Sequence, residues 1–147
     1  GAKSLNTIVT NIVFKDFSTY EGQWLNGKMN GIGTLSFYTG EKFQGQFKKG
    51  TMHGTGSFMF PDGEKYEGQW LNGKMDGYGI YTYPNGDRLY GQWEDNSFLI
   101  GTGLVHFANG DFYRGEWRND MMGGPGTYYF VDGQKIEGRW KANEPVP

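Results

Sequence analysis

A 23-residue repeat runs through most of this chain and constrains its fold more than any other feature. Tyr-x-Gly-x-Trp, or a near variant, begins at Tyr20, Phe43, Tyr66, Leu89, Tyr113 and Ile136. A Gly-x-Gly motif and a turn glycine recur in the same register, for example at Gly77/Gly79 and at Gly86. A unit this short cannot bury a core alone, so stacked neighbours must share one. The sequence therefore predicts a solenoid.

We treat residues 1–147 as a single domain built from these repeats. It comprises a half repeat at 8–19, whole repeats that begin at residues 20, 43, 66, 89 and 113, and a terminal half repeat at 136–141. One interval is 24 residues long instead of 23, because an extra residue lies between Trp93 and Gly101. We expect this residue to be absorbed before Leu99.

Each repeat has the pattern of a β-hairpin. A first arm such as YEGQW is followed by an expected turn such as LNGKMNG and by a second arm such as IGTLSFY, and the next turn is of the type PDGEK. Asn-Gly and Asp-Gly favour tight hairpin turns, because both residues tolerate a positive φ. Glycine interrupts every stretch, which disfavours long helices. The sequence predicts an all-β fold with one elongated antiparallel sheet.

Side-chain alternation predicts that one face of this sheet is aromatic. Tyr66, Gly68 and Trp70 share a face, and so do Gly79 and Tyr81. The glycines leave room for a ring from an adjacent strand to lie on bare backbone. The resulting aromatic ladder comprises Trp24, Phe47, Trp70, Trp93, Trp117 and Trp140, with Leu35, Phe58, Tyr81, Val105 and Tyr128 on the second arms.

The repeated strings YEGQWLNGKMNGIGTLSF and YEGQWLNGKMDGYGIYTYPNGD resemble MORN repeats (membrane occupation and recognition nexus). The resemblance covers about residues 20–140. The sequence departs from the family pattern in Leu89 and Ile136 at the leading aromatic position, in Phe47 for Trp, and in the inserted residue. The resemblance implies a twisted single sheet with a grooved face. It also implies one of several roles: cytoskeletal or ciliary scaffold, adaptor for a helix or peptide, membrane tether, or module of a larger enzyme.

Composition and charge narrow these roles. Fourteen basic and sixteen acidic residues give a net charge of −2, which argues against a nucleic-acid partner. The chain has no cysteine, which excludes disulfides and thiol nucleophiles and fits a cytoplasmic location. No apolar run approaches the roughly 20 residues of a membrane-spanning helix.

The aromatic ladder and a neighbouring methionine stripe form the first candidate site. A single-layer sheet needs these rings for its own stability, but it cannot hide its whole apolar face. Aromatic and methionine anchors are typical of grooves that bind peptides. We predict that the partner-binding residues are Trp24, Phe47, Trp70, Trp93, Trp117, Phe58, Tyr81, Met29, Met52 and Met75. The full stripe, which also contains Leu99 and Met122, is expected to line one rim, and packing between hairpin turns is its alternative role.

The opposite face becomes less polar toward the C-terminus. The residues concerned are Tyr90, Leu104, His106, Phe112 and Tyr129. We hypothesise that this patch serves self-association as a homodimer or contact with a partner, and drift in a solvated face is the alternative.

Lipid binding and catalysis have weaker support. Lys42, Lys65 and Arg88 recur at the repeat spacing, but an acidic residue precedes each, and the chain lacks the dense basic cluster typical of anionic lipid recognition. The only histidines, His53 and His106, lie in different repeats. We expect no enzyme activity, no cofactor and no metal.

Together these observations predict a non-catalytic scaffold that binds a partner helix or extended peptide along the aromatic groove. The resemblance places such a scaffold in a cytoskeletal, ciliary or membrane-associated assembly. The alternatives are a phospholipid-binding membrane tether and a regulatory module of a larger enzyme.

Overall fold

The computed structural model describes residues 8–101 and 103–147, which form 14 strands and no helix. The strands are β1 (Ile8–Val13), β2 (Thr19–Leu25), β3 (Lys28–Ser36), β4 (Lys42–Lys48), β5 (Thr51–Met59), β6 (Lys65–Leu71), β7 (Lys74–Thr82), β8 (Arg88–Glu94), β9 (Ser97–Phe98), β10 (Gly103–His106), β11 (Phe112–Arg118), β12 (Met121–Tyr129), β13 (Lys135–Lys141) and β14 (Glu144–Val146).

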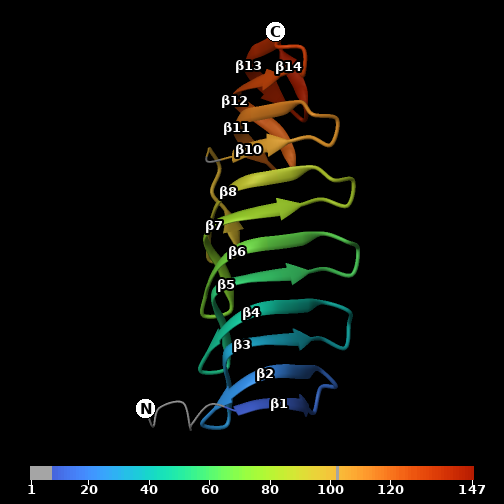
Figure 1. Ribbon diagram of the computed structural model, residues 1–147. Helices are drawn as coiled ribbons and strands as arrows, with labels where there is room; N and C mark the ends of the chain where they lie inside the picture. The colour runs from blue at the N-terminus through green and yellow to red at the C-terminus, as the bar shows by residue number, and fades with distance from the viewer. Residues whose placement is uncertain (1–7, 102) are drawn as a thin grey trace.

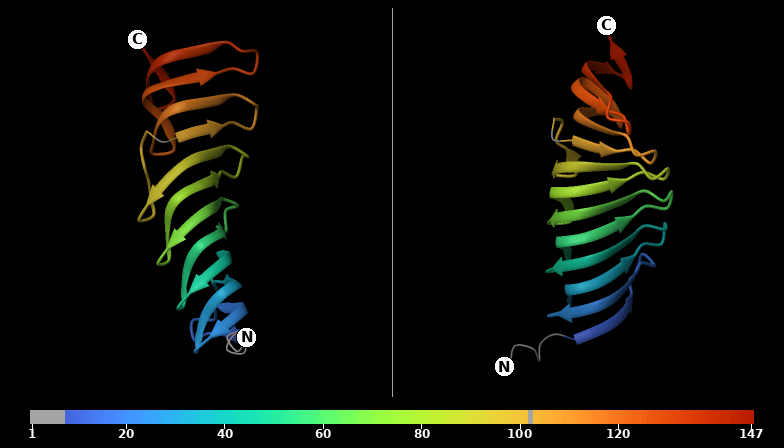
Figure 2. Two further views of the ribbon diagram at one scale, coloured as in Figure 1. Left: turned by 60° about the vertical axis from the view of Figure 1, so that its left-hand side comes forward. Right: turned by 45° about the horizontal axis from the view of Figure 1, so that its top comes forward.

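All of these strands belong to one antiparallel sheet that follows chain order. β9 alone lies off the path and pairs with β8, so that β8 and β10 are direct neighbours. Successive hairpins stack from the N-terminal to the C-terminal end (Figure 1). Figure 2 shows the twist that accumulates along the stack. The predicted all-β single sheet is confirmed.

The turns at one edge of the sheet contain only two residues. Asn26 and Gly27 both have positive φ angles, 51° and 76°, as a hairpin turn of this kind requires. The expected seven-residue turn LNGKMNG was therefore wrong. Its second half belongs to β3, and Met29 pairs with Trp24 across the hairpin. The methionine stripe thus lies on strands near this edge and faces the aromatic ladder.

The turns at the other edge are longer and follow the predicted PDGEK type. The Phe60 amide donates to the Glu64 carbonyl at 2.8 Å, and the Gly63 amide donates back to the Phe60 carbonyl at 3.1 Å. The Asp62 carboxylate accepts from the Glu64 amide at 2.9 Å. The same backbone pattern recurs in every turn at this edge from Phe14 onward.

The core lies on one face, where the leading aromatic residue of most repeats covers two glycines. Tyr66 is 0% exposed, and its ring covers Gly79 on the neighbouring strand so closely that a methyl group there would lie within 2.6 Å of Cζ and Oη. The Tyr66 hydroxyl donates to the Gln69 carbonyl at 2.9 Å, and burial raises its pKa to about 12. The prediction that rings lie on bare backbone is confirmed. The covering ring is the leading tyrosine or phenylalanine of the repeat: Tyr20, Phe43, Tyr66 or Tyr113.

The tryptophan row then links one repeat to the next. The Trp70 ring meets the Tyr66 ring edge-on at a centroid distance of 5.3 Å, and it meets Phe43 of the preceding repeat at 5.2 Å. Its Nε1 donates to the Gly56 carbonyl at 3.1 Å. Each such ring therefore belongs to two hairpins, so the core is one continuous row rather than separate clusters.

The inserted residue lies later than expected. Trp93 pairs with Phe98, just as Trp70 pairs with Met75, and the Leu99 amide donates to the Gln92 carbonyl at 2.8 Å. The fourth member of the methionine stripe is thus Phe98, and the prediction of Leu99 was wrong. The extra residue falls after Phe98, where β9 ends.

Candidate binding groove

A groove runs along the aromatic face of the sheet. Three cavities of about 380, 250 and 530 Å³ follow one another along it. The first and second share Met75 and Asn96, and the second and third share Tyr83, Trp117 and Asp120. Because neighbouring cavities share lining residues, we describe them as one groove and name them the first, second and third cavity.

Seven of the ten predicted partner-binding residues line this groove, whereas Trp24, Phe47 and Met29 line none of its three cavities. Three of the seven are buried, with 5–6% of their surface exposed, and form the floor: Trp70, Trp93 and Trp117. The other four are half-buried and pack against the buried core: Met52, Phe58, Met75 and Tyr81. A partner in the groove would meet the second set first.

One wall of the groove was not among the predicted partner-binding residues. It consists of four aromatic residues that begin longer turns: Phe37, Phe60, Tyr83 and Phe107. Phe14 and Phe130 begin equivalent turns but line none of the three cavities. Phe37 and Phe60 line the first cavity, and Phe107 lines the third. These residues keep the repeat spacing, so the periodicity could have identified them.

The methionine side of the groove is held by hydrogen bonds between successive two-residue turns. The Gly73 amide donates to the Met52 carbonyl at 2.8 Å. One repeat later, the Met75 amide donates to Oδ1 of Asn96 at 2.8 Å, and the Asn96 amide donates to the Met75 carbonyl at 3.0 Å. The methionines therefore stand on backbone that the next hairpin fixes.

The two edges of the sheet meet at one place. The Tyr83 hydroxyl, from a longer turn, donates to Oδ1 of Asp120, from a two-residue turn, at 2.8 Å. Nε1 of Trp117 donates to the same hydroxyl at 3.2 Å. Burial, the largest cause, raises the pKa of Tyr83 above its ordinary value of 10.0, which already leaves the hydroxyl protonated and able to donate at neutral pH. The sheet is thus curved enough to bring its opposite edges into contact between the second and third cavities.

The charged residues that line the groove are all acidic. Among the residues that the structure describes, no lysine or arginine lines any of its three cavities, whereas Glu64, Asp87 and Asp120 line the third. Burial and then the neighbouring Asp62 raise the pKa of Glu64. Among the described residues no group of three or more histidine, aspartate or glutamate side chains could hold a metal ion.

The family model for the MORN repeat matches this chain four times, at residues 20–42, 43–65, 66–88 and 113–135. The chain belongs to the MORN-repeat family. The segment between the third and fourth matches contains β9 and the inserted residue. No curated protein matches the sequence of this MORN domain.

A solved structure has a similar fold. It is described as the SAS-4 (dCPAP) TCP domain in complex with a Proline Rich Motif of Ana2 (dSTIL) of Drosophila melanogaster. The match has a TM-score of 0.57 and 14% sequence identity, and it covers 89% of this chain and 71% of the other. Within the residues described for this MORN domain, no helix has the length and apolarity needed to cross a membrane.

The opposite face of the MORN domain carries the second candidate patch. Tyr90 pairs with Leu104, and His106 pairs with Phe112. The His106 ring lies 5.2 Å from Tyr90 and 5.8 Å from Phe112, and the Phe112 ring stacks on Tyr129 at 4.5 Å. The five predicted residues are therefore contiguous. A role in self-association stays a prediction.

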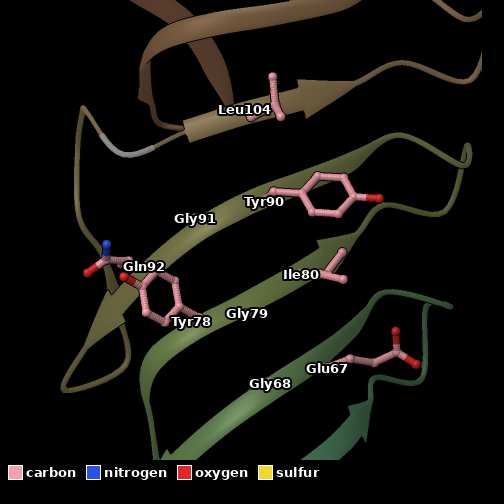
Figure 3. A pocket seen from close by; sticks show the side chains of 9 residues that line it. All are labelled: Glu67, Gly68, Tyr78, Gly79, Ile80, Tyr90, Gly91, Gln92 and Leu104. Atoms are coloured by element: carbon pink, nitrogen blue, oxygen red, sulfur yellow. The ribbon is translucent and has the colours of Figure 1, made fainter.

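A shallow hollow adjoins this patch. Tyr78, Ile80 and Tyr90 line it together with Leu104, and its volume is about 450 Å³ (Figure 3). These side chains project from β7, β8 and β10. Tyr90 and Leu104 belong to the predicted patch, whereas Tyr78, which is 66% exposed, was not predicted as part of it.

Asp111 should make the MORN domain sensitive to acid. The Tyr128 hydroxyl donates to its Oδ2 at 2.6 Å, and this hydrogen bond is the largest cause that lowers the pKa of Asp111. The Val131 amide donates to Oδ1 at 3.0 Å and acts in the same direction. A lowered folded-state pKa contributes stability that is fully present above the ordinary value of 3.8 and is lost as the pH falls through the folded-state pKa.

We therefore expect Asp111→Asn to be less stable than the wild type at pH 7, and the gap to shrink as the pH falls below 3.8. Urea denaturation of both proteins at pH 7, 4 and 3 measures this gap. A gap that is independent of pH would contradict the assignment to the carboxylate.

Proposed function

We propose that this MORN domain is a non-catalytic scaffold that binds a helix or an extended segment of a partner protein along the groove. The observation that carries this proposal is the continuity of the three cavities, whose lining runs from Phe37 to Asn143. A single small molecule would fill only one cavity, whereas a polypeptide segment can occupy all three.

The lining of the groove supports a protein ligand. Its floor is rigid at Trp70, because that ring packs between Phe43 and Tyr66, the leading aromatics of two successive repeats. Its walls carry half-buried methionine and phenylalanine side chains, which adapt to apolar side chains of a partner. Aromatic rings in such positions supply much of the binding energy of protein interfaces.

The similarly folded SAS-4 TCP domain also supports the proposal, because its structure contains a proline-rich motif of a second protein. For the present domain we propose the same class of ligand, a polypeptide segment. We further propose that the scaffold serves a cytoskeletal or ciliary assembly in the cytoplasm.

Selection of a random 16-residue peptide library displayed on phage tests the proposal. We expect peptides selected on the wild type to bind the double variant Met52→Gln/Met75→Gln about tenfold or more weakly, because polar side chains then stand in the groove wall. Met59→Gln is the matched control, since Met59 is 49% exposed and pairs with Lys42 and Lys65 on the opposite face.

Peptides that bind the groove variant and the wild type equally would contradict the proposal. So would a selection that enriches no peptide. Far-UV circular dichroism and thermal unfolding of each variant establish that the sheet is intact before binding is compared.

A further inference from the structure

The chemistry of the groove changes along its length. The first cavity is lined by Phe37, Met52, Phe58, Phe60, Trp70, Gly73, Met75 and Asn96, without any charged residue. The third cavity combines three carboxylates with four aromatic rings: Glu64, Asp87 and Asp120 with Tyr83, Phe107, Trp117 and Tyr128. The groove is thus apolar toward its N-terminal end and acidic toward its C-terminal end.

The domain itself does not neutralise these carboxylates. The four ion pairs among the described residues are Lys65–Glu67, Lys74–Asp95, Arg118–Glu116 and Lys135–Glu137. None of them includes Glu64, Asp87 or Asp120. The described hydrogen bonds to Asp87 and Asp120 come from neutral donors, so the negative charge remains.

Two of the carboxylates are held in place. Asp87 accepts from the Ala108 amide through Oδ1 at 2.9 Å and from Nδ2 of Asn85 through Oδ2 at 3.0 Å. Asp120 accepts from the Tyr83 hydroxyl, which Trp117 fixes in turn. A carboxylate oxygen has two lone pairs, so both groups retain acceptor capacity for a further donor.

A cation is the group that this cavity complements. Charge-assisted hydrogen bonds to a carboxylate are about twice as strong as neutral ones. The rings of Trp117, Tyr128 and Phe107 can also contact a lysine or arginine side chain through their faces. A partner side chain that is apolar or acidic would leave the three carboxylates desolvated or would repel them.

We propose that the segment bound by the groove is apolar at one end and cationic at the other. Its apolar side chains fill the first cavity, and a lysine or arginine side chain enters the third cavity between the carboxylates and the rings. This arrangement fixes the direction of the bound segment. The inference rests on the proposed function, because it names the chemistry of the same ligand.

The peptide library described above is the probe. We expect the selected sequences to carry lysine or arginine near one end and large apolar residues near the other. The variant Glu64→Gln/Asp87→Asn/Asp120→Asn removes three charges but keeps oxygen acceptors. It should bind these peptides about 10-fold to 100-fold more weakly, the range of hydrogen bonds to charged groups.

The matched control is Glu21→Gln/Glu67→Gln/Glu137→Gln, which removes the same charge from the opposite face, where these residues pair with Thr34, Ile80 and Thr127. It should bind as the wild type does. Equal weakening by both triple variants would overturn the inference, because it would show that only net charge matters.

The outcomes separate this inference from the proposed function. Selected peptides that depend on Met52 and Met75 but lack a cationic end, or that ignore the three carboxylates, overturn the inference alone. A selection without any groove-dependent peptide overturns both.

Discussion

Trp70→Ala is expected to lower the free energy of unfolding by about 4 kcal/mol, the usual loss when a buried tryptophan is truncated to alanine. Trp70 is 6% exposed and lies between Phe43 and Tyr66, which belong to successive repeats. Its removal leaves a cavity at the junction of two hairpins and deprives the Gly56 carbonyl of a donor. In a stack of repeats, each unit is stabilised mainly by its neighbours. We therefore also expect the unfolding transition to broaden as the two halves of the sheet lose their coupling.

Trp70→Phe is the matched control for this prediction. Phenylalanine stands naturally at the equivalent position, Phe47, where it meets the Phe43 ring edge-on at 5.1 Å. It should keep most of the edge contacts and cost about 1–2 kcal/mol, because the lost volume and one hydrogen bond are smaller terms. Urea denaturation followed by circular dichroism measures both variants. Equal losses for alanine and phenylalanine would show that the ring is not the link between repeats.

Gly79→Ala is expected to cost about 3 kcal/mol, although it adds only one methyl group. That methyl group would lie within 2.6 Å of Cζ and Oη of Tyr66, whose ring is fully buried. The ring would have to leave the glycine pair and give up its hydrogen bond to Gln69. The cost comes from overpacking rather than from the backbone, because Gly79 is not among the residues with positive φ.

Gly103→Ala is the positional control for Gly79→Ala. Gly103 is the same glycine in the repeat that begins with Leu89 instead of an aromatic residue. There, the added methyl group would meet Cζ of Phe98 at 3.2 Å and Cδ1 of Leu89 at 3.4 Å, both at side-chain ends. We expect a loss of about 1 kcal/mol or less. If thermal and urea unfolding gave similar losses for the two variants, the packing of a ring on glycine would not explain why glycine stands there.

The repeat unit and the all-β single sheet could be predicted from the sequence, because periodicity and hairpin turns are local features. Residue parity also identified the aromatic face, since Tyr66, Gly68 and Trp70 keep a regular register where β6 pairs with β5. Parity could not separate a buried floor from an accessible wall. The accessibility of Trp70 and of Met75 depends on which ring covers which stretch of backbone. This packing is set by the curvature of the sheet, which side-chain alternation alone does not give.

Three features depended on geometry that the sequence does not encode locally. The interval of 24 residues shows that a loop contains an extra residue but not where in the loop it lies. Leu99 was therefore predicted as the member of the methionine stripe, whereas Phe98 is the residue that pairs with Trp93. The expected seven-residue turn, residues 25–31, contains two glycines. Gly27 closes the actual two-residue turn, whereas Gly31 lies where the register of the hairpin shifts. The contact between Tyr83 and Asp120 joins residues 37 apart and follows from twist and curvature together.

The most direct test of groove binding is a methyl NMR titration of protein labelled at its methionine methyl groups with a peptide selected from the library. Six methionines give probes on both faces. Met52, Met75 and Met122 line the groove, while Met59 and Met121 alternate with groove-facing neighbours and lie on the opposite face. We predict that the peptide shifts the signals of Met52, Met75 and Met122 and leaves those of Met59 and Met121 unchanged. Shifts confined to Met59 and Met121 would place the peptide on the other face and contradict binding in the groove.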